Sequence, residues 1–348
     1  MNSQMRYIRL GIVAIAIVGG YFFSKNRPKP APTNTGQPTR TASDRDSRTG
    51  RTDRATSTGA GEPTPDSEFW TRDSVPGAAP STGNVAGIGC WNIEWFSLDA
   101  KNPRADSDVD RMATIIKQSG MAVIGLEEIS GEPALAALTE RLPGWKYTIG
   151  TTGRQQKCAI IWDSSRAEVG RAFEYLDIND GIEKGEGNLR APLVAPVKIG
   201  NFDFLFTVVH LKAMFEPENL AARRKQLSRL RARLSEEAKK RNDSDVIVVG
   251  DFNDFAGSVA LKELTARQGT SGYLITGARL PDNVSTYIPK SGRIDHVVVS
   301  SPGVSQEQWD GQGYVFPKPT KADRKLYLET VSDHLPTWAN FRTDKDND

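Results

Sequence analysis

From Val85 onward, apolar runs alternate with polar and helical stretches, and no second linker interrupts the pattern. Each run is bounded by turn-forming or charged residues, which is typical of strands. Several runs are apolar at consecutive positions, so both faces of those strands are expected to be covered. The runs are residues 85–93, 122–126, 146–150, 158–162, 191–199, 202–211, 245–250 and 294–299, with a last stretch at 335–341.

Two of the intervening segments carry a helical signal. Residues 107–119 repeat apolar side chains with a helical period and stop at Gly120. Residues 217–241 begin with Pro217 and Glu218 and are rich in arginine and lysine. We interpret that second helix as solvated on its basic face and packed through its leucines, with a phosphate-tracking surface as the alternative. Strands alternating with helices predict one α/β domain over residues 85–348.

The first 84 residues differ in kind. Residues 10–23 form an unbroken apolar run preceded by Arg6 and Arg9, and no small-residue cleavage site follows. We predict that residues 1–23 are a signal anchor, with a cleaved signal peptide as the alternative. Residues 24–84 are rich in Thr, Ser, Pro and Gly, which predicts a disordered tether. The expected location of the domain is therefore outside the cytoplasm, anchored to a membrane or secreted.

Charge and cysteine usage narrow the function classes. Residues 1–84 hold 11 basic and 7 acidic residues, so the other 264 residues hold 34 and 36 of the totals of 45 and 43. The folded part thus carries a net charge of −2, which is not the charge of a strongly basic nucleic-acid-binding domain. Cys90 and Cys158 lie in apolar runs and are predicted to be buried thiols, with a single bridge between them left open.

Polar side chains fall at the ends of the predicted strands. In α/β sheets, sites assemble in the crevice outside the strand ends. Each of these residues alone has an ordinary interpretation as a turn former. All three histidines of the chain, however, lie within such motifs. The residues are Asn92, Glu127, Glu128, His210, Asp251, Asn253, Asp295, His296, Asp333 and His334.

The residue types in this set indicate metal-assisted hydrolysis. Carboxylates and amides without cysteine ligands favour a hard cation, Mg²⁺, Mn²⁺ or Ca²⁺. An imidazole beside a carboxylate is suited to take a proton. A metal site, a His–Asp pair and a nearby Arg are together the equipment of phosphoester hydrolysis.

The motifs WNIEWF, GLEEI, VVHLKA, GDFND, STY with RIDHVVVS, and SDHLP occur in this order and span about residues 86–342. In this order they resemble the endonuclease/exonuclease/phosphatase superfamily, which has the deoxyribonuclease I-like fold. The resemblance implies an α/β fold that is a four-layer α/β/β/α sandwich of two packed mixed sheets. It also implies an enzyme that hydrolyses phosphate esters with a divalent metal, most often Mg²⁺.

The resemblance implies a role for each residue that matches a motif. Asn92 and Glu128 would hold the metal ion, and Asp333 would support it from the other side. The family usually has Gln before this Glu, whereas this chain has Glu127, whose added charge is expected to tighten metal binding or to raise the pKa of a neighbouring carboxyl.

The remaining matches concern catalysis. Asp251 and Asn253 would orient the phosphate and the attacking water. Asp295 would pair with His334, the general base, and His210 would act from the opposite side as an electrophile or acid. His296 matches no family role and is interpreted as structural. Arg190 would contact the phosphate, although the segment 171–190 that ends at it is acidic.

The fold does not fix the substrate. The HLKA ending resembles bacterial secreted or membrane-attached nucleases, so a DNA or RNA phosphodiester is the predicted substrate. A sphingomyelinase or an inositol-polyphosphate phosphatase would use the same core, and a membrane tether is compatible with a lipid substrate. A non-catalytic tethered binding module is a further alternative. We expect a monomer with no protein partner.

Overall fold

The computed structural model of the protein describes residues 68–98, 106–182 and 189–346. The predicted signal anchor at residues 1–23 lies outside these ranges. None of the helices within them combines the length and the apolarity that crossing a bilayer requires.

The first of two mixed sheets has six strands. Its central pair, β1 and β2, is parallel and every other neighbouring pair is antiparallel. The order is β12 (Trp309–Val315), β13 (Thr337–Arg342), β1 (Val85–Phe96), β2 (Met121–Ile129), β4 (Lys157–Asp163) and β3 (Trp145–Ile149).

The second sheet has a parallel pair at its centre as well, β8 with β9. The remaining neighbours are antiparallel. The order is β10 (Gly272–Ile275), β11 (Asp295–Ser301), β9 (Val246–Asp251), β8 (Phe202–His210), β7 (Leu193–Ile199) and β5 (Glu168–Val169), with β6 (Phe173–Glu174) also paired to β7.

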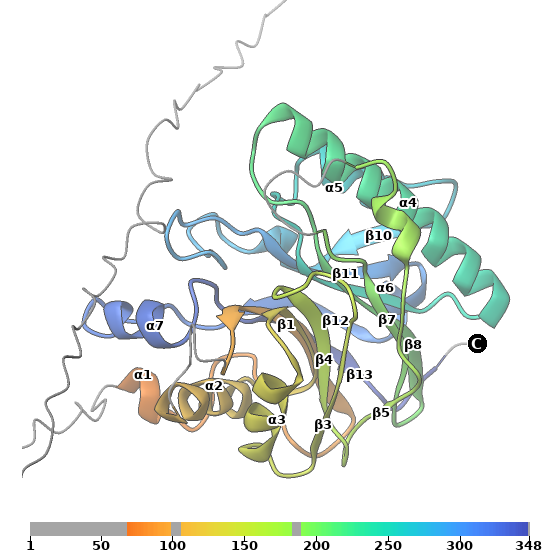
Figure 1. Cartoon of the computed structure of the whole chain (residues 1–348). Helices are drawn as coiled ribbons and strands as arrows, with labels where there is room; N and C mark the ends of the chain where they lie inside the picture. The colour runs from red at the N-terminus through yellow and green to blue at the C-terminus, as the bar shows by residue number, and fades with distance from the viewer. Residues whose placement is uncertain (1–67, 99–105, 183–188, 347–348) are drawn as a thin grey trace, which may run out of the picture. The chain divides into compact units, whose positions relative to one another are not determined.

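The helices cover the outer faces of the two sheets (Figure 1). Helices α2 and α3 lie over the first sheet, and α4 and α5 lie over the second. The helical segments are α1 (Glu68–Thr71), α2 (Asp106–Ser119), α3 (Glu132–Glu140), α4 (Pro217–Arg241), α5 (Val259–Thr265), α6 (Gly303–Glu307) and α7 (Arg324–Thr330), with the 3₁₀ turns η1 (Leu176–Asn179) and η2 (Thr276–Arg279).

Three apolar clusters hold these layers together. One lies between the first sheet and its helices, one between the two sheets, and one between the second sheet and α4 and α5. The middle cluster contains alternate residues of both sheets, such as Ile88 and Cys90 of β1 and Val249 of β9. Three buried clusters between four layers are the predicted α/β/β/α sandwich, which is thereby confirmed.

All nine predicted runs form strands, and both predicted helices form. The strands β5, β6, β10 and β12 are not predicted from the sequence because they are short or, in β12, interrupted by Gly311 and Gly313. Both cysteines are free and buried, as predicted, so the alternative of a bridge between Cys90 and Cys158 is wrong.

Residues 68–84 were expected to belong to the disordered tether, but the structure packs them against the first sheet and its helices. Phe69 is 1% exposed and lies edge-on to the Tyr327 ring. The indole of Trp70 donates to Asp323, and Val75 N–H donates to the carbonyl of Gln118. The two adjacent aromatic rings, within an otherwise polar sequence, supply the buried surface that this attachment requires. Residues 24–67 lie outside the described ranges.

Candidate active site

Strand alternation places four polar side chains in the crevice between the sheets. On β1, Ile88 and Cys90 face the second sheet, so Asn92 faces it too. By the same period of two, the last residues of β8 and β9, His210 and Asp251, and the first residue of β11, Asp295, lie on the face that meets the first sheet. His210 is opposite Asp251, and Asp251 is opposite Asp295 in the strand register. All four are buried and lie at one edge of the sandwich.

Glu128 joins this group because its strand breaks the alternation. Leu126 points toward the helices, so a regular strand would point Glu128 the same way. Instead Glu128 has φ 65°, and the pairing of β2 with both neighbours shifts register here. Such a bulge re-aims a side chain. The Glu128 carboxylate thus accepts hydrogen bonds from Asn92 Nδ2 at 3.3 Å and from Trp95 N–H at 3.2 Å.

Glu127 keeps the regular alternation and is therefore buried between the sheets. It is 0% exposed, and neither of its carboxylate oxygens has a hydrogen-bond partner among the described residues. Burial, and then the charges of Asp295 and Asp251, hold its pKa well above its ordinary value. Glu127 is thus a core carboxyl behind the site, whereas Glu128 belongs to the site itself.

Asn92 links the two carboxylates nearest to it. Its Nδ2 donates to Glu128 Oε1 and, at 3.2 Å, to Asp251 Oδ2. Its Oδ1 accepts from the N–H of Glu94 at 3.1 Å. The structure therefore brings together the two predicted metal ligands Asn92 and Glu128, and adds Asp251 to them. Asp251 and Asn253 are joined as well, since Asn253 N–H donates to Asp251 Oδ1 at 2.8 Å.

His334 is hydrogen-bonded to the distant Asp295, whereas its neighbour Asp333 makes only a longer contact with it. Its Nδ1 lies 2.9 Å and 3.0 Å from the two Asp295 oxygens, and both side chains are buried. Nε2 points toward the carboxylate cluster, 3.7 Å from Asp333 Oδ1. Burial alone would lower the pKa of His334, but the charge of Asp295 and its hydrogen bond outweigh it, and the net pKa is raised well above the ordinary value.

His210 and Arg190 lie on the other side of the cluster. His210 Nε2 is 3.6 Å from Asp251 Oδ2 and 3.8 Å from Glu128 Oε1. Burial, Arg190 and His334 hold the pKa of His210 well below its ordinary value, so its ring is neutral near pH 7. Arg190 is buried, and burial lowers the pKa of its guanidinium, against the opposing charge of Glu128. A neutral imidazole and a guanidinium thus face the same carboxylates.

The charge balance of the cluster fits a bound divalent cation. Asp251, Asp295 and His334 bring their ligand atoms within 4.8 Å of one another. Burial raises the pKa of Asp251, and the charge of Asp295 adds to the rise. Burial also raises the pKa of Asp333, where Glu128 adds a like charge. Buried carboxylates that oppose each other's ionisation are the ligand set that a hard cation neutralises.

The residues that hold these groups in place were not predicted from the sequence. Ser332 Oγ donates to the carbonyl of Asn92 at 2.7 Å and accepts from the N–H of His334 at 2.9 Å. The Tyr287 ring lies 4.9 Å from the His334 ring, and Thr286 Oγ1 accepts from the N–H of Asp295. Ser332 belongs to SDHLP, and Thr286 and Tyr287 to STY, so the signal was in motifs already noted.

A buried amide on α4 links the segment after His210 to the backbone of Arg190. Gln226 is 0% exposed; its Oε1 accepts from Lys212 N–H, two residues after His210, and its Nε2 donates to Asn179 Oδ1. Asn179 in turn donates to the carbonyl of Arg190 at 2.9 Å. The arginines of α4 are likewise engaged: Arg233, for example, binds Asp177. This side of α4 therefore packs against the domain. That agrees with the predicted structural role of the helix better than with a phosphate-tracking surface.

Replacing Glu127 with glutamine is expected to change the pH dependence of stability. A carboxyl whose folded pKa is raised binds more protons when folded, so stability falls as the pH rises above its unfolded pKa. The fall attributable to one group is at most about 1.4 kcal/mol per pH unit. Urea unfolding in EDTA from pH 5 to 8 should show Glu127→Gln gaining stability over the wild type as the pH rises. A difference that is constant with pH would contradict this interpretation of Glu127.

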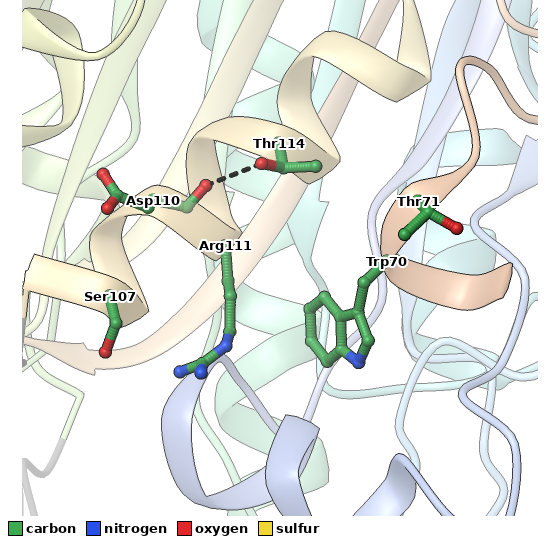
Figure 2. A pocket seen from close by; sticks show the side chains of 6 residues that line it. All are labelled: Trp70, Thr71, Ser107, Asp110, Arg111 and Thr114. Atoms are coloured by element: carbon green, nitrogen blue, oxygen red, sulfur yellow. Dashed lines mark hydrogen bonds between the residues drawn. The ribbon is translucent and has the colours of Figure 1, made fainter. Parts of the chain in front are cut away.

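A shallow pocket of about 310 Å³ lies between α1 and α2, away from this site (Figure 2). It is lined by Trp70 and Thr71 from α1 and by Ser107, Asp110, Arg111 and Thr114 from α2. None of the polar residues described above lines it, and we assign it no role in the chemistry.

Comparisons with known proteins agree with this architecture. The model of the Endonuclease/Exonuclease/phosphatase family matches residues 89–334. The comparison with curated proteins yields no match. Similar solved structures include TDP2 from D. rerio, complexed with single strand DNA product, at 18% identity and a TM-score of 0.56, with 74% of this chain and 99% of that chain covered.

Two bacterial structures are also similar. An endonuclease/exonuclease/phosphatase from Bacteroides vulgatus has 18% identity and a TM-score of 0.56, covering 75% of this chain and 99% of its own. A mannosyl-6-phosphatase from Bacteroides thetaiotaomicron has 16% identity and a TM-score of 0.50, covering 74% and 99%. At these identities the likeness concerns the fold.

Proposed function

This chain belongs to the Endonuclease/Exonuclease/phosphatase family, and on that premise we propose that it is a metal-dependent nuclease that hydrolyses phosphodiesters of DNA or RNA. Family membership indicates a hydrolase of phosphodiesters or phosphate esters. The observation that carries the finer proposal is the buried Asp295–His334 pair, whose free imidazole nitrogen faces the carboxylate cluster. The TDP2 structure that holds a single-strand DNA product supports a nucleic-acid substrate.

In the proposed mechanism His334 is the general base. Asp295 holds the proton on Nδ1, so that Nε2 is left to take a proton from water. The resulting imidazolium is stabilised by the Asp295 carboxylate at 2.9 Å. Ser332 fixes the backbone of His334 against β1, which keeps the base at the edge of the crevice.

The other side chains bind and polarise the phosphate. Asn92 and Glu128, with Asp251 and Asp333 beside them, would hold the divalent ion, which when bound supplies Lewis-acid stabilisation of negative charge on the phosphate oxygens. Arg190 pairs with a phosphate oxygen, and neutral His210 donates a hydrogen bond toward the phosphate or the leaving oxygen. Asn253 completes the set by holding the Asp251 carboxylate through its N–H.

The test is an activity panel on the full chain with Mg²⁺, Mn²⁺ or Ca²⁺, with EDTA as the control. The substrates are plasmid DNA, single-stranded DNA, RNA, sphingomyelin and inositol polyphosphates. Metal-dependent hydrolysis of an oligonucleotide supports the proposal. Hydrolysis confined to sphingomyelin or inositol phosphates would replace it with the corresponding esterase, and hydrolysis of nothing would favour a binding module.

The proposal extends to location. A domain attached to a membrane through residues 1–23, or secreted after their removal, would meet nucleic acid outside the cytoplasm, acting as a monomer. Fractionation of cells that express the full chain, with protease added to intact cells or spheroplasts, tests this part.

A further inference from the structure

Three of the exposed aromatic side chains of the described ranges come a few residues after site residues in the sequence. Trp95 follows Asn92 on β1, Phe215 follows His210 on β8, and Phe255 follows Asp251 on β9. Exposing a large aromatic ring to water is unfavourable, so a group of them marks a surface that something covers. The full set is Trp95, Leu98, Phe173, Leu176, Phe215, Phe255, Val259 and Leu274.

Phe215 and Phe255 pack against each other. Their rings are stacked with centroids 5.8 Å apart and planes within 15° of parallel. Phe215 is 54% exposed and Phe255 49% exposed, so the pair is open to solvent. We call these two rings the aromatic pair.

The aromatic pair is held rigidly by a buried cation. Arg223 of α4 is 1% exposed and bonds to Asp254 at 2.9 Å. It also donates to the carbonyls of Lys212 and Met214, and its guanidinium lies 5.7 Å from the centre of the Phe215 ring. Arg223 thus clamps the loop after β8 to the loop after β9.

The aromatic pair adjoins the catalytic residues. The loops that carry it begin at His210 and Asp251, which are paired in register. Gly292 lies against the Phe255 ring, since a Cβ on it would meet Phe255 Cε1 at 3.5 Å. Gly292 is bonded to Tyr287, whose ring lies 4.9 Å from His334. Contacts through Gly292 and Tyr287 therefore connect the aromatic pair to His334.

We propose that the aromatic pair stacks an unpaired nucleobase next to the scissile phosphate, so that the enzyme acts on single-stranded nucleic acid or on an unpaired end. This inference rests on the proposed nuclease function. Stacking on aromatic side chains is how proteins hold single strands without reading sequence. Tracking duplex phosphates would instead need free cations, whereas Arg223, Arg224 and Arg233 of the neighbouring helix are paired with carboxylates.

The test asks whether binding needs the flat aromatic rings of Phe215 and Phe255 or only an apolar surface at these positions. A double variant, Phe215→Leu with Phe255→Leu, keeps an apolar surface but loses the flat rings, whereas Phe255→Trp keeps a flat ring. The substrates are one single-stranded oligonucleotide and a series in which a tetrahydrofuran abasic residue replaces one nucleotide at a time. Leu274→Ala, which removes an exposed apolar side chain from β10, is the control.

For the wild type and for Phe255→Trp, removing the stacked base is expected to raise KM about 5- to 100-fold with little change in kcat. The double leucine variant should show the raised KM with the intact oligonucleotide and no further rise with the abasic one, and Leu274→Ala should match the wild type. Equal KM for the leucine variant and the wild type would overturn the proposal, as would insensitivity to base removal at every position.

Two other outcomes are distinguishable. If phosphatidylcholine vesicles bind the wild type but not Phe215→Ala with Phe255→Ala, while oligonucleotide kinetics are unchanged, the pair is a membrane contact and the proposal is wrong. If the wild type hydrolyses no oligonucleotide with any of the three metals, the nuclease function itself fails, and the stacked base fails with it.

Discussion

Replacing His334 with alanine is expected to lower kcat by about 10²–10⁴-fold, the usual contribution of a positioned general base, while KM changes little. The reason is geometric. Nδ1 of His334 is hydrogen-bonded to a carboxylate while Nε2 faces the cluster, and no other histidine among the described residues has this arrangement. Steady-state kinetics on a single-stranded oligonucleotide measures both constants.

His296 supplies the matched control. It is adjacent to Asp295 on β11 but points to the other face, where its Nε2 lies 2.9 Å from the carbonyl of Asp254. His296→Gln retains a polar group at that position. It should lower the free energy of unfolding but leave kcat close to the wild-type value. A His334→Ala enzyme that turns over at the wild-type rate would rule out His334 as the base.

The pH dependence tests the same residue without removing it. The base must be unprotonated, so the rate is expected to rise with pH through the pKa of His334. Asp295→Asn removes the charge and the acceptor that raise this pKa. The variant should therefore be slower, because the tautomer is no longer fixed, and the rising limb of its pH–rate profile should move to lower pH. A bound cation lowers the pKa of His334 in both enzymes. The result is therefore the difference between the pH–rate profiles of the wild type and Asp295→Asn.

The strand pattern of the sequence was sufficient for the α/β class and for placing polar side chains at the strand ends, whereas the four-layer sandwich was implied by the family resemblance. Because alternation is strict, Asn92, His210, Asp251 and Asp295 at the ends of four apolar runs had to share the crevice between the sheets. The partner of His334, by contrast, is 39 residues away, and the pairing could be inferred only from the family resemblance.

What could not be predicted depends on local irregularity or on contacts distant in sequence. Glu127 and Glu128 are identical in type, and only the bulge at Glu128 decides which of them joins the site. Phe69 and Trp70 are two aromatic residues in a polar segment, and their burial requires a surface formed by α2 and α7. The aromatic pair likewise depends on Arg223, a residue that looks like one of many cations on α4 until its contacts with Asp254 are seen.

Replacing Glu128 with glutamine is expected to raise the metal concentration needed for half-maximal activity by at least about 10–100-fold, the loss typical of disturbing even an outer group of a metal site. Glutamine keeps the size of the side chain and its acceptor for Trp95 N–H, but it removes the negative charge that a hard cation requires. EDTA should abolish activity in the wild type, and added Mg²⁺ or Mn²⁺ should restore it.

Glu127→Gln is the control for this experiment, since it removes the neighbouring carboxyl that faces the core between the sheets. Its metal requirement should stay close to that of the wild type. Thermal unfolding gives a readout independent of turnover: an ion that binds only the folded state raises Tm in proportion to the logarithm of its concentration above Kd. This rise should be present in the wild type and in Glu127→Gln, and shifted to higher metal concentration in Glu128→Gln. If Glu127→Gln were the variant that lost the response, the ligand would be the carboxyl on the regular face of the strand, and the bulge at Glu128 would have no part in binding the metal.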